Sequence, residues 1–215
     1  LLLAERFEGI GAWTKAQVLF MLGYAVIAGG LQDLLFGYNV KFISRRIGRG
    51  QLDHLLVQPQ PLWQALLTEG FLPFSAGAVL VPGLVLLGWA LAALPPPASP
   101  AWLAALLANL VASAAIGLAF SCFWSSLAFW APSAAEEVSS SANRLLSRLT
   151  PFPLDGLGQP LLAGLLTVVP AGFLAWYPSR ALLGLDPTPY AVAVTPLAAL
   201  LLSALAAWLF TRGLR

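Results

Sequence analysis

The chain has 215 residues, of which 59% are hydrophobic and only 9% are charged, with a net charge of +2. Soluble domains are about one-quarter charged, so this composition excludes an ordinary soluble globular protein. The chain has a single cysteine and a single histidine. It therefore cannot form an intramolecular disulfide. With one cysteine and one histidine, a zinc site or a bis-histidine haem built by this chain alone is also unfavoured.

Several apolar runs are long enough to cross a bilayer as helices, which requires about 20 residues. They are continuous rather than alternating in hydrophobicity, and this indicates helices rather than barrel strands. We therefore predict an all-α, polytopic helical membrane protein. Its predicted spans cover residues 16–40, 62–94, 101–130, a shorter run at 161–177 and a last span at 191–210. Pro73 and Pro82 are expected to kink the second span, and Pro170 breaks the short run.

The chain begins with "LLLAERFEGIG" rather than with methionine. We expect that an earlier span precedes it, so that about five of six spans are present within one transmembrane domain over residues 1–215. Basic residues are concentrated in the polar break at 41–63 and in the C-terminal tail. The positive-inside rule then places both segments in the cytoplasm of a multi-pass protein of the cell membrane.

The polar break has its own apolar periodicity, which predicts a short amphipathic helix exposed to the cytoplasm. The periodic positions are Ile43, Ile47, Leu52, Leu55 and Leu56. Gly48 and Gly50 weaken this helix, and Pro59 and Pro61 end it. Two interpretations remain open: a basic loop lying on anionic headgroups, or a docking helix for a cytosolic partner.

Residues 134–149 place polar and basic side chains on one side of a helix, including Asn143, Arg144 and Arg148. An arginine at the centre of a bilayer costs about 2.5–3.5 kcal/mol, so this face is expected to meet protein, water or headgroups. The segment is either a span lining a translocation path or a subunit seam, or an amphipathic helix at the cytoplasmic interface. Asp33, inside the first span, is a functional-site hypothesis for the same reason, unless it lies close enough to the cytoplasmic end to be hydrated.

The third span carries small or polar residues at every fourth position, and we interpret this row as helix packing rather than as a site. The row consists of Asn109, Ser113, Gly117, Ser121 and Ser125.

The stretch "GRGQLDHLLVQP" resembles the G-x-L-D-x-x-L-x-x-P passage of type-2 ABC transporter permeases, in the uncharacterised or efflux-type branch. The matching residues are Gly50, Leu52, Asp53, Leu56 and Pro59. The stretch "PFPLDGLGQPLLAGLLTVVPAGFLAWYPSRALLG" is similar to the proline-rich passage that precedes the last span of this family. The resemblance covers the chain from Trp13 onward and departs from the family in lacking its first span.

The resemblance implies a six-span permease subunit of an ATP-driven exporter that works as a homo- or heterodimer by alternating access. Residues 48–59 would form the coupling helix, on which cytosolic ATPase subunits dock; Arg49 lies in this stretch. Two short re-entrant helices would lie on the outer side, between about 150 and 177. ATP and Mg²⁺ would bind to the partner ATPase, and this chain would bind no cofactor and would not itself be an enzyme. No nucleic acid is expected as a partner.

Two other classes of function remain as alternatives. One is a non-catalytic anchor or assembly subunit of a larger membrane complex, which hydropathy alone allows. The other is a membrane-embedded enzyme, although the sequence lacks paired intramembrane carboxylates, a cluster of metal ligands and a nucleophile with its base. A docking helix between two spans distinguishes the permease from the anchor, because an anchor has no use for one.

Overall fold

The computed structural model describes residues 9–10, 13–35, 43–51, 57–62, 65, 73–94 and 99–214. Almost all of the described residues that have regular secondary structure are helical. The elements in chain order are β1 (Gly9–Ile10), β2 (Trp13–Thr14), α2 (Lys15–Leu35), α4 (Ile43–Gly48), α7 (Pro73–Ala93), α8 (Pro100–Ser126), η1 (Leu127–Phe129), α9 (Pro132–Leu149), α10 (Gln159–Thr167), η2 (Pro170–Phe173), α11 (Trp176–Leu182) and α12 (Ala191–Gly213). The prediction of an all-α fold is confirmed, apart from the two-residue hairpin before α2.

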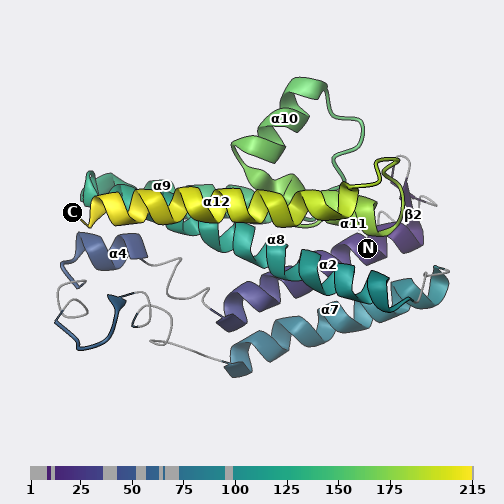
Figure 1. Cartoon of the computed structure of the whole chain (residues 1–215), viewed down its shortest axis with the longest axis horizontal. Coiled ribbons are helices and arrows are strands. Elements are labelled where there is room, and N and C mark those ends of the chain that lie inside the picture. Colours follow the sequence, from purple (N-terminus) through teal and green to yellow (C-terminus); the bar gives the residue numbers. More distant parts are fainter. Residues whose placement is uncertain are drawn as a thin grey trace.

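The long helices α2, α7, α8 and α12 form an elongated bundle in which α8 contacts α2, α9 and α12 (Figure 1). Helix α10 projects away from the side of this bundle, whereas α4 lies near the C-terminal end of α12 (Figure 1). Three helices within the described ranges are long and apolar enough to cross a membrane, or four if the bent pair α10 and η2–α11 counts as one span. Five spans therefore remain a prediction, because the beginning of the second span lies outside the described residues.

The predicted span boundaries agree with the helices at most positions. Helix α8 begins at Pro100 because the Ser99 hydroxyl accepts the Trp102 N–H at 3.2 Å, and proline needs no N–H partner in a first turn. Pro82 lies inside α7 as expected. Pro73 is the first described residue of α7, and the residues just before it lie outside the described part of the chain, so the kink expected there stays a prediction.

Helix α4 ends earlier than the apolar periodicity predicts. The Gly50 N–H donates to Ile47 O at 3.1 Å and the Gln51 N–H donates to Arg46 O at 2.9 Å, with Gly50 at a φ of +66°. These two bonds form a Schellman motif, which ends a helix at a left-handed glycine. One continuous amphipathic helix from 43 to 56 is therefore wrong, and residues 52–56 lie outside the described part of the chain.

Breaks in the backbone between α9 and α12 occur where the prolines predict them. Helix α10 ends at Thr167, and the segment that begins at Pro170 bends from it by 69°. The prediction that no single straight helix crosses this region is confirmed. The inner core lies between α2, α7, α8 and α11. Its largest fully buried side chains include Phe20, Met21 and Tyr24 of α2.

Large apolar side chains are exposed on the outer faces of α7, α8 and α12. Examples are Val85 at 62%, Val111 at 62% and Leu201 at 73%. A soluble monomer rarely exposes such extended apolar patches. This surface is the one expected of helices that face lipid hydrocarbon.

Candidate functional site: a cavity between α2 and α9 and an Asp155–Arg180 cluster

Helix α8 carries the fourfold-spaced row of small and polar residues, and each member contacts a neighbouring element. Near the start of the row, Asn109 donates to Val192 O of α12 at 3.1 Å. Ser113 donates to Phe173 O at 2.9 Å, and its hydroxyl is also 2.9 Å from that of Tyr24. Because a spacing of four residues exceeds the helical repeat of 3.6, each member is rotated by about 40° from the one before, and successive members face different neighbours.

The second half of this row fixes α9 against α8. The Ser121 hydroxyl donates to Asn143 Oδ1 at 2.5 Å, and the hydroxyls of Ser125 and Ser139 lie 3.0 Å apart. Since the positions rise along α9 as they fall along α8, the two helices are antiparallel. The interpretation of the row as helix packing is confirmed.

A cavity of about 320 Å³ lies between α2, α9 and the start of the segment after η2. Asp33 and Asn143, two of the four residues predicted for a translocation path, both line it. Asp33 is exposed near the end of α2, where its carboxylate can be hydrated. Gln32 also lines the cavity and is 8% exposed.

The two predicted arginines of α9 do not line this cavity. Arg144 and Arg148 are exposed on the side of α9 that points away from α8. The Arg144 guanidinium donates to Ser140 Oγ at 3.3 Å and to Ser141 Oγ at 3.2 Å, both on its own helix. The four residues predicted for the path therefore lie on two different surfaces. Asp33 and Asn143 line the cavity between helices, whereas Arg144 and Arg148 lie on the exposed face of α9.

The predicted docking segment is described at three of its six residues. Arg49, Gly50 and Pro59 are all exposed. The other three, Leu52, Asp53 and Leu56, lie outside the described residues. Their role in docking stays a prediction.

Helix α4, which leads into the docking segment, is anchored to the bundle. Ile43 is 2% exposed and belongs to an apolar cluster with Cys122, Phe129 and Phe210. On the surface, Arg45 forms an ion pair with Glu136 at the start of α9, with an N–O distance of 2.7 Å. α4 thus contacts the adjoining ends of α8, η1 and α9.

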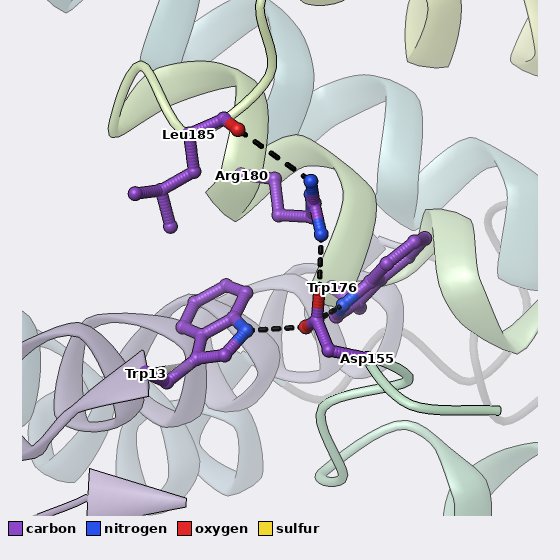
Figure 2. Close-up of polar contacts among 5 residues, drawn as sticks. All are labelled: Trp13, Asp155, Trp176, Arg180 and Leu185. Carbon is purple, nitrogen blue, oxygen red and sulfur yellow. Dashed lines mark hydrogen bonds and ion pairs between the residues drawn. The ribbon is translucent and has the colours of Figure 1, made fainter. Parts of the chain in front are cut away.

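A cluster of polar side chains around Asp155 involves α11, which lies at the end of the bundle away from α4 (Figure 1); Figure 2 shows the cluster. Asp155, in the turn after α9, accepts hydrogen bonds from the indole N–H groups of Trp13 and of Trp176, the latter at 2.7 Å, and pairs with the guanidinium of Arg180. The Arg180 guanidinium also lies over the Trp176 ring, 5.1 Å from its centroid, and donates to Leu185 O at 3.5 Å. One partly buried carboxylate therefore connects β2, the α9–α10 turn and α11.

The sequence matches the family described as ABC-2 family transporter protein over residues 1–215. The chain belongs to this family. No match was found among curated proteins, and none among solved structures. The ABC-2 chain is accordingly a multi-pass membrane protein and a permease component of an ABC transporter, as the resemblance in its motifs implied.

Three residues of this ABC-2 permease were not selected by sequence reasoning. Asp155 was missed because its partners Trp13 and Arg180 are distant in sequence, and an aspartate beside glycine in a proline-rich turn is typical of an ordinary loop. The contact between Gln32 and Gly117 was also missed. In the sequence, Gln32 is an uncharged residue beside the more conspicuous Asp33, and Gly117 was assigned to the row of packing residues on α8. The signal available for Asp155 was an acidic residue and a basic one, Arg180, in two neighbouring segments between α9 and α12.

Proposed function

We propose that this chain is the membrane-spanning subunit of an ATP-driven exporter, which moves its substrate by alternating access. A separate cytosolic ATPase subunit binds ATP and Mg²⁺, and residues 49–59 are its docking segment. The family match over the whole chain carries this proposal, because members of the ABC-2 family are the membrane components of ABC transporters. Two permease chains, identical or different, form the complete pathway.

The anchoring of α4 supports docking at the segment that follows it. A docking segment can transmit movement only if it is anchored to the membrane helices. Helix α4, which precedes it, is anchored by the buried Ile43 and by the Arg45–Glu136 ion pair. Because Glu136 belongs to α9, a displacement of the docking segment is transmitted to the helix that forms one wall of the cavity. Such a transmission is the physical requirement for coupling ATP-driven closure to a change of access.

The position of the basic residues supports a cytoplasmic docking segment. Arg45, Arg46 and Arg49 lie near the end of α12 that carries Arg212, because Ile43 and Phe210 belong to one apolar cluster. Arg180 lies at the other end of the bundle (Figures 1 and 2). This asymmetry agrees with the positive-inside rule if the α4 end is cytoplasmic.

The open face of α9 supports a second permease chain. This helix runs antiparallel to the apolar α8, yet it exposes Arg144 and Arg148. Each arginine in contact with hydrocarbon costs about 2.5–3.5 kcal/mol on the mildest scale. Protein, water or headgroups therefore cover this face, and a seam between two permeases, which also forms the path for substrate, would supply the first two.

Co-purification from the native cells tests the proposal. The full-length protein is extracted in mild detergent, and an ATPase subunit is expected to elute with it. A Leu56→Asp, Asp53→Arg double variant is expected to lose that subunit. The matched control, Leu157→Asp with Asp186→Arg, makes the same chemical changes in connections at the other end and is expected to retain it.

A negative result would favour the alternative that the chain is a non-catalytic anchor or assembly subunit of a larger membrane complex. If no ATPase elutes with the wild type, the permease function is contradicted, and the co-eluting proteins identify the complex that the chain anchors. If the ATPase stays bound to the double variant, docking occurs elsewhere on the chain.

A further inference from the structure

We propose that Arg144 and Arg148, on the exposed face of α9, bind a phosphate group of the exported substrate part-way across the membrane. The inference rests on the proposed function, which places this face in the path between two permeases, and it specifies the chemical class of the substrate. Three features of the two arginines carry it: their depth in the membrane, their lack of an acidic partner, and their spacing on the helix.

The first feature is the depth of the two side chains, which follows from the packing of α9 on α8. Two hydrogen-bonded contacts fix the register of these antiparallel helices: Ser121 with Asn143, and Ser125 with Ser139. Continued along both helices, this register places Arg144 level with Phe120. Arg148, about one turn further along α9, lies level with Ile116.

The length of α8 relates these levels to the bilayer. Its 27 residues extend about 40 Å, the thickness of a bilayer with its headgroup regions. The middle of the helix, at Ser113, then lies near the bilayer centre. Ile116 is about 5 Å from that middle along the helix axis, and Phe120 is about 10 Å from it. Both arginines therefore lie at the level of the hydrocarbon, which extends about 15 Å to either side of the centre.

The second feature is that no carboxylate neutralises either guanidinium. Neither arginine forms an ion pair with any residue in the described part of the chain. On the same helix, Glu136 is paired with Arg45, and Glu137 lies about 10 Å before Arg144, towards the α4 end. Unpaired charges are costly away from bulk water, so an anion is the ligand that gains most from binding at this level.

The third feature is the spacing of the two arginines. Residues four apart on a helix are neighbours, and like charges at this spacing repel each other. One anion between the two guanidinium groups replaces that repulsion with two attractions. The Arg144 guanidinium donates to the hydroxyls of Ser140 and Ser141, at 3.3 and 3.2 Å, and its remaining N–H groups are available to a ligand.

The number of donors favours phosphate over carboxylate as the anion. A guanidinium group binds two oxygens of either anion side by side. One such contact occupies both oxygens of a carboxylate. A phosphate group has further oxygens for the second arginine and carries up to two negative charges, which match the two positive charges of the pair.

Photo-crosslinking of the full chain in nanodiscs, with whatever subunits co-elute, tests the proposal. Three probes share one alkyl chain, with a diazirine beside a phosphate, a carboxylate or a trimethylammonium head. The α9 peptides are expected to be labelled most by the phosphate probe and least by the trimethylammonium probe, and excess octyl phosphate is expected to compete. Equal labelling by the phosphate and trimethylammonium probes would contradict an anion site, and stronger labelling by the carboxylate probe would contradict the choice of phosphate.

Variants test the role of each arginine. Arg144→Gln and Arg148→Gln remove the charge from exposed positions, and each is expected to weaken labelling by the phosphate probe about tenfold or more, the effect of losing a hydrogen bond to a charged group. Arg148→Lys keeps the charge without the planar fork and is expected to weaken it less. Arg212→Gln makes the same change at an exposed arginine of α12 and is the matched control, expected to label as wild type. Labelling that is unchanged in both glutamine variants contradicts the site, and the comparison of the three probes on the wild type needs no variant.

Two further arms separate a transported phosphate from that of a resident membrane phospholipid. ATP with vanadate, which traps the closed ATPase pair, is expected to reduce labelling, because the path changes its access. Labelling that nucleotide leaves unchanged and that added phosphatidylglycerol abolishes would identify a resident lipid and contradict a substrate site. Co-elution of the ATPase is scored on the same preparation, so a bound ATPase without phosphate preference refutes this site alone, whereas absence of the ATPase refutes the permease function.

Discussion

Replacing Asp155 by alanine is expected to destabilise the end of the bundle at which Trp13 and α11 meet. The substitution removes the acceptor of two indole N–H groups and the partner of Arg180. The side chains of Arg180 and Asp155 are 25% and 19% exposed, so water only partly replaces the lost interactions.

The magnitude follows from the number and burial of the bonds. A hydrogen bond to a charged group contributes about 1.5–3 kcal/mol, and breaking a fully buried ion pair costs about 3–5 kcal/mol. For this partly exposed cluster we expect a loss of roughly 2–4 kcal/mol. In a chain of this length, that corresponds to a fall in melting temperature of roughly 4–16 °C.

The assay is thermal unfolding of the purified protein in detergent, followed by its tryptophan fluorescence. Asp186→Ala is the matched control, because among the described residues that carboxylate accepts hydrogen bonds from Thr188 alone, at 3.0 Å from its nitrogen and 2.6 Å from its hydroxyl oxygen. Its loss is expected to be about 1 kcal/mol or less. If Asp155→Ala is no less stable than Asp186→Ala, the cluster does not hold this end of the bundle together.

The remaining predictions concern three other contacts. Gly83→Ala places a Cβ 2.8 Å from a side-chain carbon of α2, so it is expected to lower stability by about 1–3 kcal/mol; an unchanged melting temperature would contradict the close packing of α2 on α7. Arg45→Glu is expected to lower stability by at most about 1 kcal/mol, because the pair is 43% and 42% exposed, and Glu136→Arg in the same chain should restore it if the pair forms. The hydrogen bond from the Thr188 hydroxyl lowers the pKa of Asp186 in the folded protein. Its contribution to the stability of the fold is therefore present above the ordinary pKa of aspartate and is lost as the pH falls through the lowered, folded-state pKa. Thr188→Val is expected to raise the pKa of Asp186 in a ¹³C-carboxyl titration, and an unchanged value would show that the hydroxyl does not stabilise the carboxylate.

Sequence reasoning predicted the long helices well because hydropathy and proline positions act locally. The beginnings of α2, α8 and α12 lie within one residue of the predicted span starts. The break at Pro170 was predicted for the same reason, since proline lacks the N–H that a continuing helix needs. The apolar periodicity through Gly50 misled the prediction of α4, because a glycine at positive φ ended the helix before the pattern did.

The site residues were less predictable because they depend on which helices become neighbours. Asn143 was selected as part of the polar face of residues 134–149 and Asp33 as an ionisable residue inside an apolar span, and both line the cavity. Spacing did not separate Asn143 from Arg144, although adjacent helical positions differ by about 100° and so face different surfaces. The Gln32–Gly117 contact and the Asp155 cluster join segments far apart in the chain, and no local pattern encodes that meeting.

The most direct test of the permease function is a crosslink between this chain and its ATPase. Benzoylphenylalanine is introduced at Val57, which is 83% exposed in the proposed docking segment, and in a matched variant at Tyr190, which is 78% exposed at the opposite end of α12. Irradiation in native membranes is expected to join position 57, and not position 190, to a subunit with an ATP-binding Walker motif. If neither position captures such a subunit, or if position 190 captures it equally well, the account of residues 49–59 as the ATPase-docking segment is contradicted.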